Sequence, residues 1–116
     1  MLLKVSNSVV RFVFWISVSG ISILALVSPA IVSPVMVFSD KIMHAGAFFV
    51  LGTLALWAYP DSKKIVFIGL LLYGGVIELA QSTIANRSPE WMDWLADILG
   101  LAFALPADRL RYLFVK

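Results

Sequence analysis

The sequence predicts an all-α membrane protein in which four transmembrane helices form one compact antiparallel bundle. Of the 116 residues, 61% are hydrophobic and 14% are charged, whereas a soluble domain carries about 45–50% apolar and about 25% charged residues. The charged residues separate long apolar runs, and a chain of this length has room for three or four spans of about 20 residues. These runs lack the alternation of barrel strands. We therefore treat residues 1–116 as a single transmembrane domain.

The first helix is expected at residues 12–30, within a long uncharged run. Pro29 and Pro34 mark its end, because proline interrupts helical hydrogen bonding. Lys4 and Arg11 before the apolar run resemble the start of a secretory signal, but no small-residue cleavage site follows. We therefore expect an uncleaved first helix, which packs against the others and carries no polar group of the site.

The second helix is expected at residues 41–59, with Ser39 as its N-cap and a tight turn at residues 59–62. The third is expected at residues 64–84, an apolar run that only Glu78 interrupts. Both runs are long enough to cross a bilayer.

The fourth helix, at residues 90–106, is the weakest of the four predicted spans. Asp93 and Asp97 lie in its first half. A basic tail, residues 107–116, follows it and is expected on the cytoplasmic surface, where anionic lipids attract Lys and Arg.

Basic residues fall mostly on one side of this arrangement. Seven of the nine share the side of the N-terminus: Lys4, Arg11, Lys63, Lys64, Arg109, Arg111 and Lys116. Only Lys41 and Arg87 fall on the opposite side. Because short cytoplasmic loops carry an excess of Lys and Arg, the sequence predicts that both termini are cytoplasmic.

Polar residues gather at the outer ends of the second, third and fourth helices. The candidate ligand-binding residues are Asp40, Lys41, His44, Glu78, Gln81, Arg87, Asp93 and Asp97. Asp93 and Asp97 are spaced i, i+4 and share a helix face with Gly100, where small residues let helices approach closely. An ionisable residue inside the membrane costs up to about 2.5–3.5 kcal/mol. We therefore expect one polar pocket that opens to the outer face.

The acidic side chains of this pocket outnumber the basic ones. Four carboxylates face two basic side chains, which leaves a formal charge of −2 with His44 neutral. In a low dielectric, a protonated His44, a protonated carboxyl, a bound cation or a cationic part of a ligand must compensate. No donor spacing is diagnostic of a metal, so neither a metal nor another cofactor is assigned. The net charge of +2 is too small to indicate a nucleic-acid partner.

Five short motifs follow one another along more than half of the chain. They are Ser39-Asp40-Lys41-x-x-His44, Phe48 to Gly52, Tyr73-Gly74-x-x-x-Glu78-x-x-Gln81, Arg87, and Asp93-x-x-x-Asp97-x-x-Gly100. In order and spacing they resemble the VanZ-like family of small bacterial membrane proteins, whose founding member is associated with resistance to teicoplanin. The sequence departs from the family pattern at Asp97, where many members have Asn, and at Ala104, where many have Gly. The resemblance implies a multi-pass protein of the bacterial cytoplasmic (inner) membrane.

These residues are compatible with three functions. In the first, the pocket binds the headgroup of an envelope lipid or of a lipid-linked cell-wall intermediate, with the tail between the helices. In the second, the protein is an enzyme that acts on such a headgroup, with His44 or Glu78 as acid or base and Arg87 or Lys41 stabilising developing charge. A small transporter is the least favoured, because no inverted repeat is visible. The sequence does not decide between binding and catalysis, nor does it give the oligomeric state.

Overall fold

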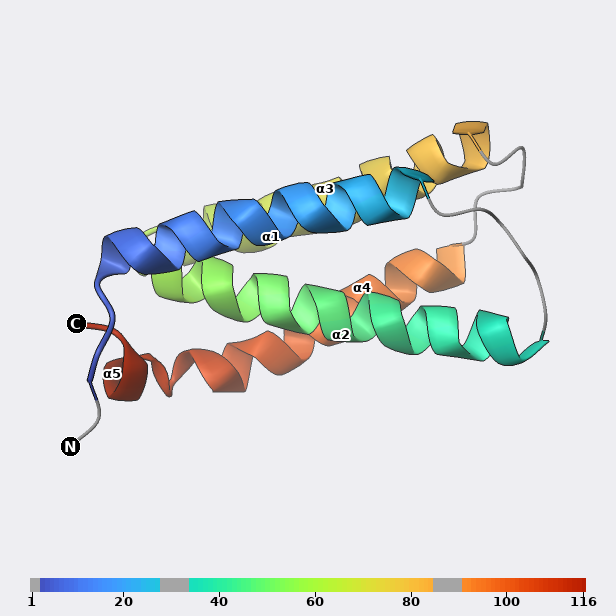
Figure 1. The fold of residues 1–116 in the computed structure, drawn as a ribbon. Coiled ribbons are helices and arrows are strands. Elements are labelled where there is room, and N and C mark those ends of the chain that lie inside the picture. The colour runs from blue at the N-terminus through green and yellow to red at the C-terminus, as the bar shows by residue number, and fades with distance from the viewer. Residues whose placement is uncertain (1–2, 28–33, 85–90) are drawn as a thin grey trace.

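The computed structural model describes residues 3–27, 34–84 and 91–116, and this part of the chain is almost entirely helical (Figure 1). Its helices are α1 (Asn7–Val27), α2 (Pro34–Ala58), α3 (Lys63–Ile84), α4 (Trp91–Asp108) and the short α5 (Arg111–Phe114). The described residues contain no β-strand, only an isolated bridge between Val5 and Val115. The all-α fold class predicted from the sequence is thus confirmed.

The four long helices lie side by side and run in alternating directions (Figure 1). Both chain termini lie at one end of the bundle, beside α5. The helices α2 and α3 each pack against the other three long helices, and the most extensive contact is that between α2 and α4. The helices α2 and α4 point in the same direction, as do α1 and α3, while helices that follow one another in the chain are antiparallel.

Two helix boundaries differ from those expected. The first helix begins at Asn7 rather than at residue 12, because a charged residue such as Arg11 limits the apolar span but does not end a helix. The second begins at Pro34 rather than at residue 41. Proline is well tolerated in the first helical turn, where its missing N–H would have no helical partner. The expected residues 28–30 of the first helix lie outside the described part of the chain.

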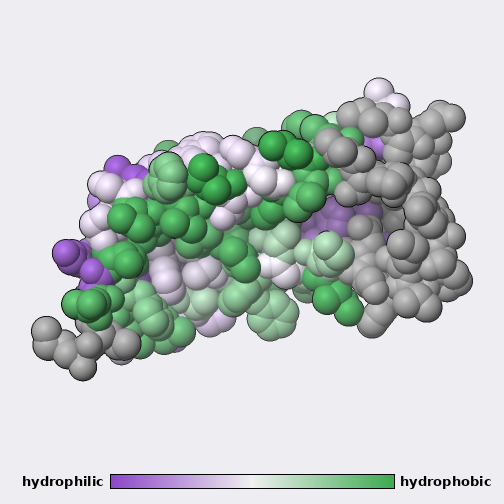
Figure 2. Space-filling view, viewed as in Figure 1, coloured by the Kyte–Doolittle hydropathy of each residue, from purple (hydrophilic) through white to green (hydrophobic). Residues whose placement is uncertain are grey.

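Apolar side chains are exposed along the long helices, whereas three acidic side chains lie inside the bundle. Exposed apolar side chains lie on all four long helices; examples are Phe12, Ile16, Ile42, Met43, Ile65, Leu72, Val76, Leu99 and Phe103. Glu78, Asp93 and Asp97 are instead 5%, 0% and 2% exposed. Figure 2 shows hydrophobic residues among residues of intermediate hydropathy along the middle of the visible face, and hydrophilic areas at the left end and in a hollow toward the right. Lipid would favour this distribution, whereas water would not.

Three helices are long and apolar enough to cross a membrane. These segments are Asn7–Leu26, Lys41–Ala58 and Lys63–Thr83, with mean hydropathies of 2.1, 1.4 and 1.7. The helix α4 is not among them, and it carries three aspartates in 18 residues. Length and composition therefore support three of the four predicted spans, and they do not support α4 as the fourth.

The contact between α2 and α4 depends on small residues. A Cβ added to Gly100 would overlap the backbone carbonyl of Ala45 and lie 2.9 Å from the backbone nitrogen of Phe49. A Cβ added to Gly52 would lie 2.9 Å from the Cβ of Ala104. The two helix backbones therefore meet at a distance that only glycine allows, as the small-residue pattern predicted.

Two arginines cap the C-terminal end of α2. Arg11 donates from Nε to the carbonyl oxygen of Ala58 (3.0 Å), and Arg111 donates from Nε to that of Trp57 (2.8 Å). Carbonyls in the last turn of a helix lack helical partners and form the negative end of its dipole. Arg11 and Arg111, both expected on the cytoplasmic side, therefore also have a structural role at this end of the bundle.

Further contacts close the same end. Backbone hydrogen bonds join Val5 to Phe114 and Lys116 to Val5, each at 3.0 Å. An ion pair of 2.6 Å joins Lys63 at the start of α3 to Asp108 at the end of α4. The predicted basic tail is thus a folded part of the bundle, and α5 lies within it.

The close approach of α2 and α4 predicts a large effect for a single methyl group. We expect Gly100→Ala to lower the free energy of unfolding by about 1–3 kcal/mol, the usual cost of forcing extra atoms into a packed contact. The measurement is helix loss, followed by circular dichroism, as SDS is added to the protein in mixed micelles.

Gly46→Ala is the matched control, because a Cβ there meets no atom within 4 Å. It should be neutral or stabilise by up to about 1 kcal/mol through helix propensity. Equal destabilisation by the two substitutions would contradict the close contact.

Candidate functional site

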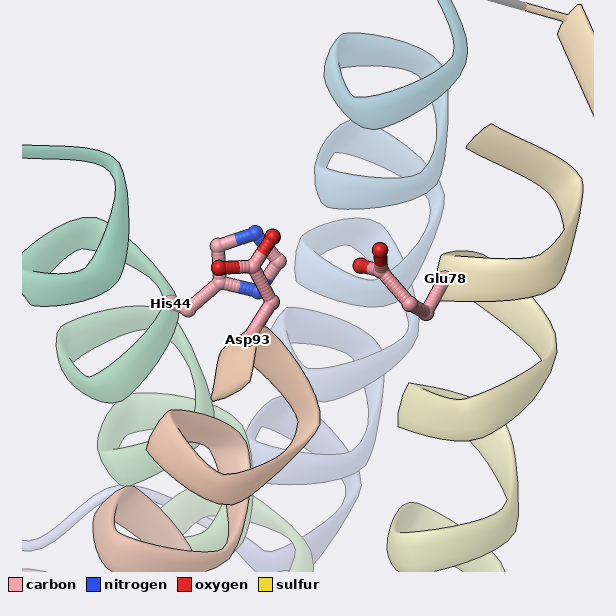
Figure 3. Close-up of side chains that lie close together, drawn as sticks. All are labelled: His44, Glu78 and Asp93. Carbon is pink, nitrogen blue, oxygen red and sulfur yellow. The ribbon is translucent and has the colours of Figure 1, made fainter. Parts of the chain in front are cut away.

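The candidate site lies where α2, α3 and α4 meet. His44 on α2, Glu78 on α3 and Asp93 on α4 each offer one donor atom, and these three atoms lie within 4.8 Å of one another. Figure 3 shows the carboxylate of Glu78 pointing toward His44 and Asp93 across the space between the helices. The structure therefore brings together three of the residues that the sequence predicted for a shared pocket.

Each of the first two aspartates of α4 is paired with a residue of α2. The Nζ of Lys41 lies 3.0 Å from Oδ1 of Asp93, and the Nδ1 of His44 lies 2.9 Å from Oδ1 of Asp97. In both helices the second residue lies about one turn after the first. Because α2 and α4 run in the same direction, the two pairs fall on successive turns of one interface.

The packing around Asp97 is tight on its α3 side as well. A Cβ on Gly74 would lie 2.8 Å from Oδ2 of Asp97 and 3.2 Å from the ring of Phe48. The absence of a side chain at residue 74 thus makes room for the acid of α4. Trp94 on α4 donates from its indole N–H to the carbonyl oxygen of Leu71 on α3 (2.9 Å), which fixes these helices against each other.

A cavity of about 180 Å³ lies beside this cluster, between α1, α2 and α3. Its lining is formed by Ile21, Leu24, Ala25, Met43, His44, Ala47, Phe48, Tyr73, Ile77 and Gln81. Most of these side chains are apolar, and His44 belongs to both the cavity and the cluster. The site therefore combines a polar group of residues with an adjoining apolar space.

The helix α1 takes part in this site, although the sequence predicted that it only packs. It contributes three residues to the cavity lining. It also accepts a hydrogen bond from Nε2 of Gln81 at the carbonyl of Ala25 (3.0 Å), and Ser22 contacts the hydroxyl of Tyr73. This role could not be predicted from the sequence, because the α1 residues concerned are apolar or small.

The described side chains of the site have a negative formal charge in sum. Three carboxylates, of Glu78, Asp93 and Asp97, face the ammonium group of Lys41 and the imidazole of His44. With His44 neutral, these groups have a formal charge of −2. Oδ2 of Asp93 is buried and accepts no hydrogen bond from any described residue. A buried carboxylate oxygen in this state favours a further positive or hydrogen-bond-donating partner.

Two of the predicted binding residues lie outside this description. The side chain of Asp40 and the whole of Arg87 fall in parts of the chain that the structure does not describe. Lys41, Gln81 and Asp97 are in the predicted region, but their described contacts are with other residues of the bundle. Their assignment as ligand-binding residues stays a prediction.

No protein-family model, no curated protein and no solved structure matches the chain.

The pair of Lys41 and Asp93 predicts a measurable contribution to stability. We expect Lys41→Met to lower the free energy of unfolding by about 3 kcal/mol, because it leaves a fully buried carboxylate without its ion-pair partner. SDS-induced unfolding followed by circular dichroism measures this change.

Lys63→Met is the matched control at the opposite end of the bundle. The Lys63 side chain is 53% exposed, and its pair with Asp108 should contribute less than about 1 kcal/mol. A loss at residue 41 no larger than the loss at residue 63 would show that the Asp93 carboxylate does not depend on Lys41.

Proposed function

We propose that the chain is a multi-pass protein of a bacterial cytoplasmic membrane with four transmembrane helices. The argument for α4 is geometric. It lies along α2, which is apolar enough to span, and it turns Asp93 and Asp97 toward α2 while Leu99 and Phe103 face outward. By composition alone α4 is too charged to count as a span. Because its acidic side chains are buried inside the bundle, they do not face lipid, and the cost of placing charge in lipid is avoided.

Under this proposal both termini are cytoplasmic. The two termini lie at the same end of the bundle, and so do the basic residues Arg11, Lys63 and Arg111. An even number of spans requires the termini to share a side, and the positive-inside rule assigns that side to the cytoplasm. The cluster of His44, Glu78 and Asp93 then lies toward the outer face.

Single cysteines test this topology, because the chain has no cysteine of its own. We expect Ser62→Cys and Lys116→Cys to react with a membrane-impermeant thiol reagent only from the cytoplasmic side. Thr83→Cys, near the end of α3, should react only from the outer side. Labelling is measured in right-side-out and inverted vesicles. Labelling of Lys116→Cys on the side of Thr83→Cys would exclude a fourth span.

The site then binds an amphiphile at the outer face. One observation supports this proposal above all. His44 belongs both to the ionisable cluster and to the lining of the apolar cavity, so the two adjoin each other. A lipid has the same division into a polar headgroup and an apolar chain. Intramembrane ionisable residues are functional by default, and purely structural polar contacts between helices average only about 0.6 kcal/mol.

The size of the cavity limits how much of the ligand it can hold. Its volume is about 180 Å³. Pockets that enclose a whole drug-sized ligand measure about 300–1,000 Å³. The cavity therefore suits one segment of an acyl or isoprenoid chain, with the rest of the chain in the surrounding lipid.

The identity of the ligand is drawn from the sequence motifs. Their resemblance to the VanZ-like family supports an envelope lipid or a lipid-linked cell-wall intermediate, and a link to resistance against teicoplanin-type glycopeptides. Teicoplanin carries an acyl chain and acts at the membrane surface, so a protein that binds such lipids there would fit that phenotype.

Filling the cavity tests lipid binding. We expect Ala47→Phe to reduce the lipid retained by the purified protein at least tenfold, because the new ring occupies the space between α1, α2 and α3. Retention is measured by native mass spectrometry after release from micelles that contain bacterial envelope lipids.

Ala102→Phe is the matched control, because Ala102 is exposed on α4 and away from the cavity lining. It should retain lipid as the unmodified protein does. Equal retention by all three proteins would contradict a lipid site in this cavity.

One observation also favours an enzyme that acts on the same ligand. Asp97 contacts Nδ1 of His44 at 2.9 Å, and a carboxylate that orients an imidazole in this way is common where histidine serves as a general base. Glu78 offers a carboxylate oxygen within 4.8 Å of a ring nitrogen of His44. Catalysis would require binding first, so the cavity-filling experiment bears on both functions.

A further inference from the structure

We propose that His44, Glu78 and Asp93 form a binding site for a divalent transition-metal ion of the Zn²⁺ or Mn²⁺ class. The three residues come from three different helices, and Figure 3 shows their side chains converging between α2, α3 and α4. This inference goes beyond lipid binding and does not depend on it.

The donor set determines the class of ion. One imidazole nitrogen and two carboxylates suit Zn²⁺, Mn²⁺ or Fe²⁺, whereas Mg²⁺ and Ca²⁺ prefer oxygen ligands alone. Two donors that bond one ion at about 2.1 Å can lie at most about 4.2 Å apart. The donor atoms lie within 4.8 Å of one another, so small side-chain rotations are enough for all three to reach one ion.

Asp93 supplies the second, independent observation. Its side chain is fully buried, and its Oδ1 is occupied by Lys41. Oδ2 accepts no hydrogen bond from any residue in the described part of the chain. Because an unpartnered carboxylate oxygen is costly in a bundle interior, the position of Oδ2 indicates a missing positive partner, which a metal ion would supply.

The surroundings of His44 match those of a metal ligand. Asp97 contacts Nδ1 of the ring at 2.9 Å, so Nε2 is the ring nitrogen left for the ion. Histidine ligands usually donate their other ring N–H to a carboxylate in this way, and such outer carboxylates contribute 10–100-fold to metal affinity. Lys41 contacts Oδ1 of Asp93 at 3.0 Å, which orients this carboxylate and leaves Oδ2 for the ion.

The charge of the cluster supports the same conclusion. Glu78, Asp93, Asp97 and Lys41 together carry a formal charge of −2 when His44 is neutral, as a ligand must be. A divalent ion brings this sum to zero. A divalent ion therefore matches the charge that these described side chains present.

Metal analysis of the untagged protein tests the proposal. The protein in micelles is treated with EDTA, exchanged into metal-free buffer, and titrated with Zn²⁺ or Mn²⁺ without added lipid. We expect one ion per chain, with Mg²⁺ and Ca²⁺ unable to displace it at equal concentration. Glu78→Gln and Asp93→Asn should each weaken binding at least tenfold, and Asp97→Asn should weaken it 10–100-fold.

Asp108→Asn is the matched control, because Asp108 is also paired with a lysine but lies at the other end of the bundle. It should keep the affinity of the unmodified protein. His44 is the sole histidine of the chain, so pulsed electron paramagnetic resonance of bound Mn²⁺ should show coupling to imidazole nitrogen from this residue alone. This signal is measured on the unmodified protein, so it tests whether His44 binds the ion even if Asp93→Asn fails to fold.

Three results would overturn the proposal. They are a folded protein that retains no ion, equal affinities for Asp93→Asn and Asp108→Asn, or bound Mn²⁺ without nitrogen coupling. The outcome is separable from that of the lipid experiment. If the metal proposal is correct, Ala47→Phe should still bind the ion. If no protein binds metal but Ala47→Phe loses lipid retention, the metal proposal fails and the lipid proposal stands.

Discussion

The structure depends on the burial of two aspartates of α4 against α2. Asp93 and Asp97 would be unfavourable on a helix that faces lipid, yet both are almost fully enclosed and each contacts a residue of α2. This pairing determines which face of α4 turns inward, and therefore which apolar residues turn outward. The same two contacts also place Asp93 next to His44 and Glu78, so the helix arrangement and the site have a common origin.

Glycine makes that pairing possible. Gly100 lies against the backbone of α2, and Gly74 leaves room for the carboxylate of Asp97. A side chain at either position would separate the helices and lengthen the distance between His44 and Asp97. In lipid, where apolar burial gives helices little reason to associate, close packing and buried polar contacts are the main attractive terms. Here both terms act at one interface.

The sequence predicted the helices and the residues that gather in the cluster, but not which side chains of the cluster contact each other. Spacing alone placed Asp93, Asp97 and Gly100 on one face of the fourth helix, and the structure confirms that shared face. It did not identify Lys41 as the partner of Asp93, because the partner depends on how far α4 is shifted along α2. Nor did it predict the part that α1 plays, since an apolar cavity wall has the same sequence pattern as any lipid-facing helix.

The two ends of the bundle differ in how their charges are satisfied. At the end that holds the termini, Arg11 and Arg111 cap α2, and Lys63 pairs with Asp108, so the charged groups close the fold. Around His44, acidic groups exceed basic ones among the described residues, and a cavity adjoins them. A buried carboxylate costs free energy unless its partners compensate its charge, so the acidic residues around His44 make this the more demanding end of the bundle. This difference between the two ends is the physical reason why the proposed ligand site is placed at the cluster.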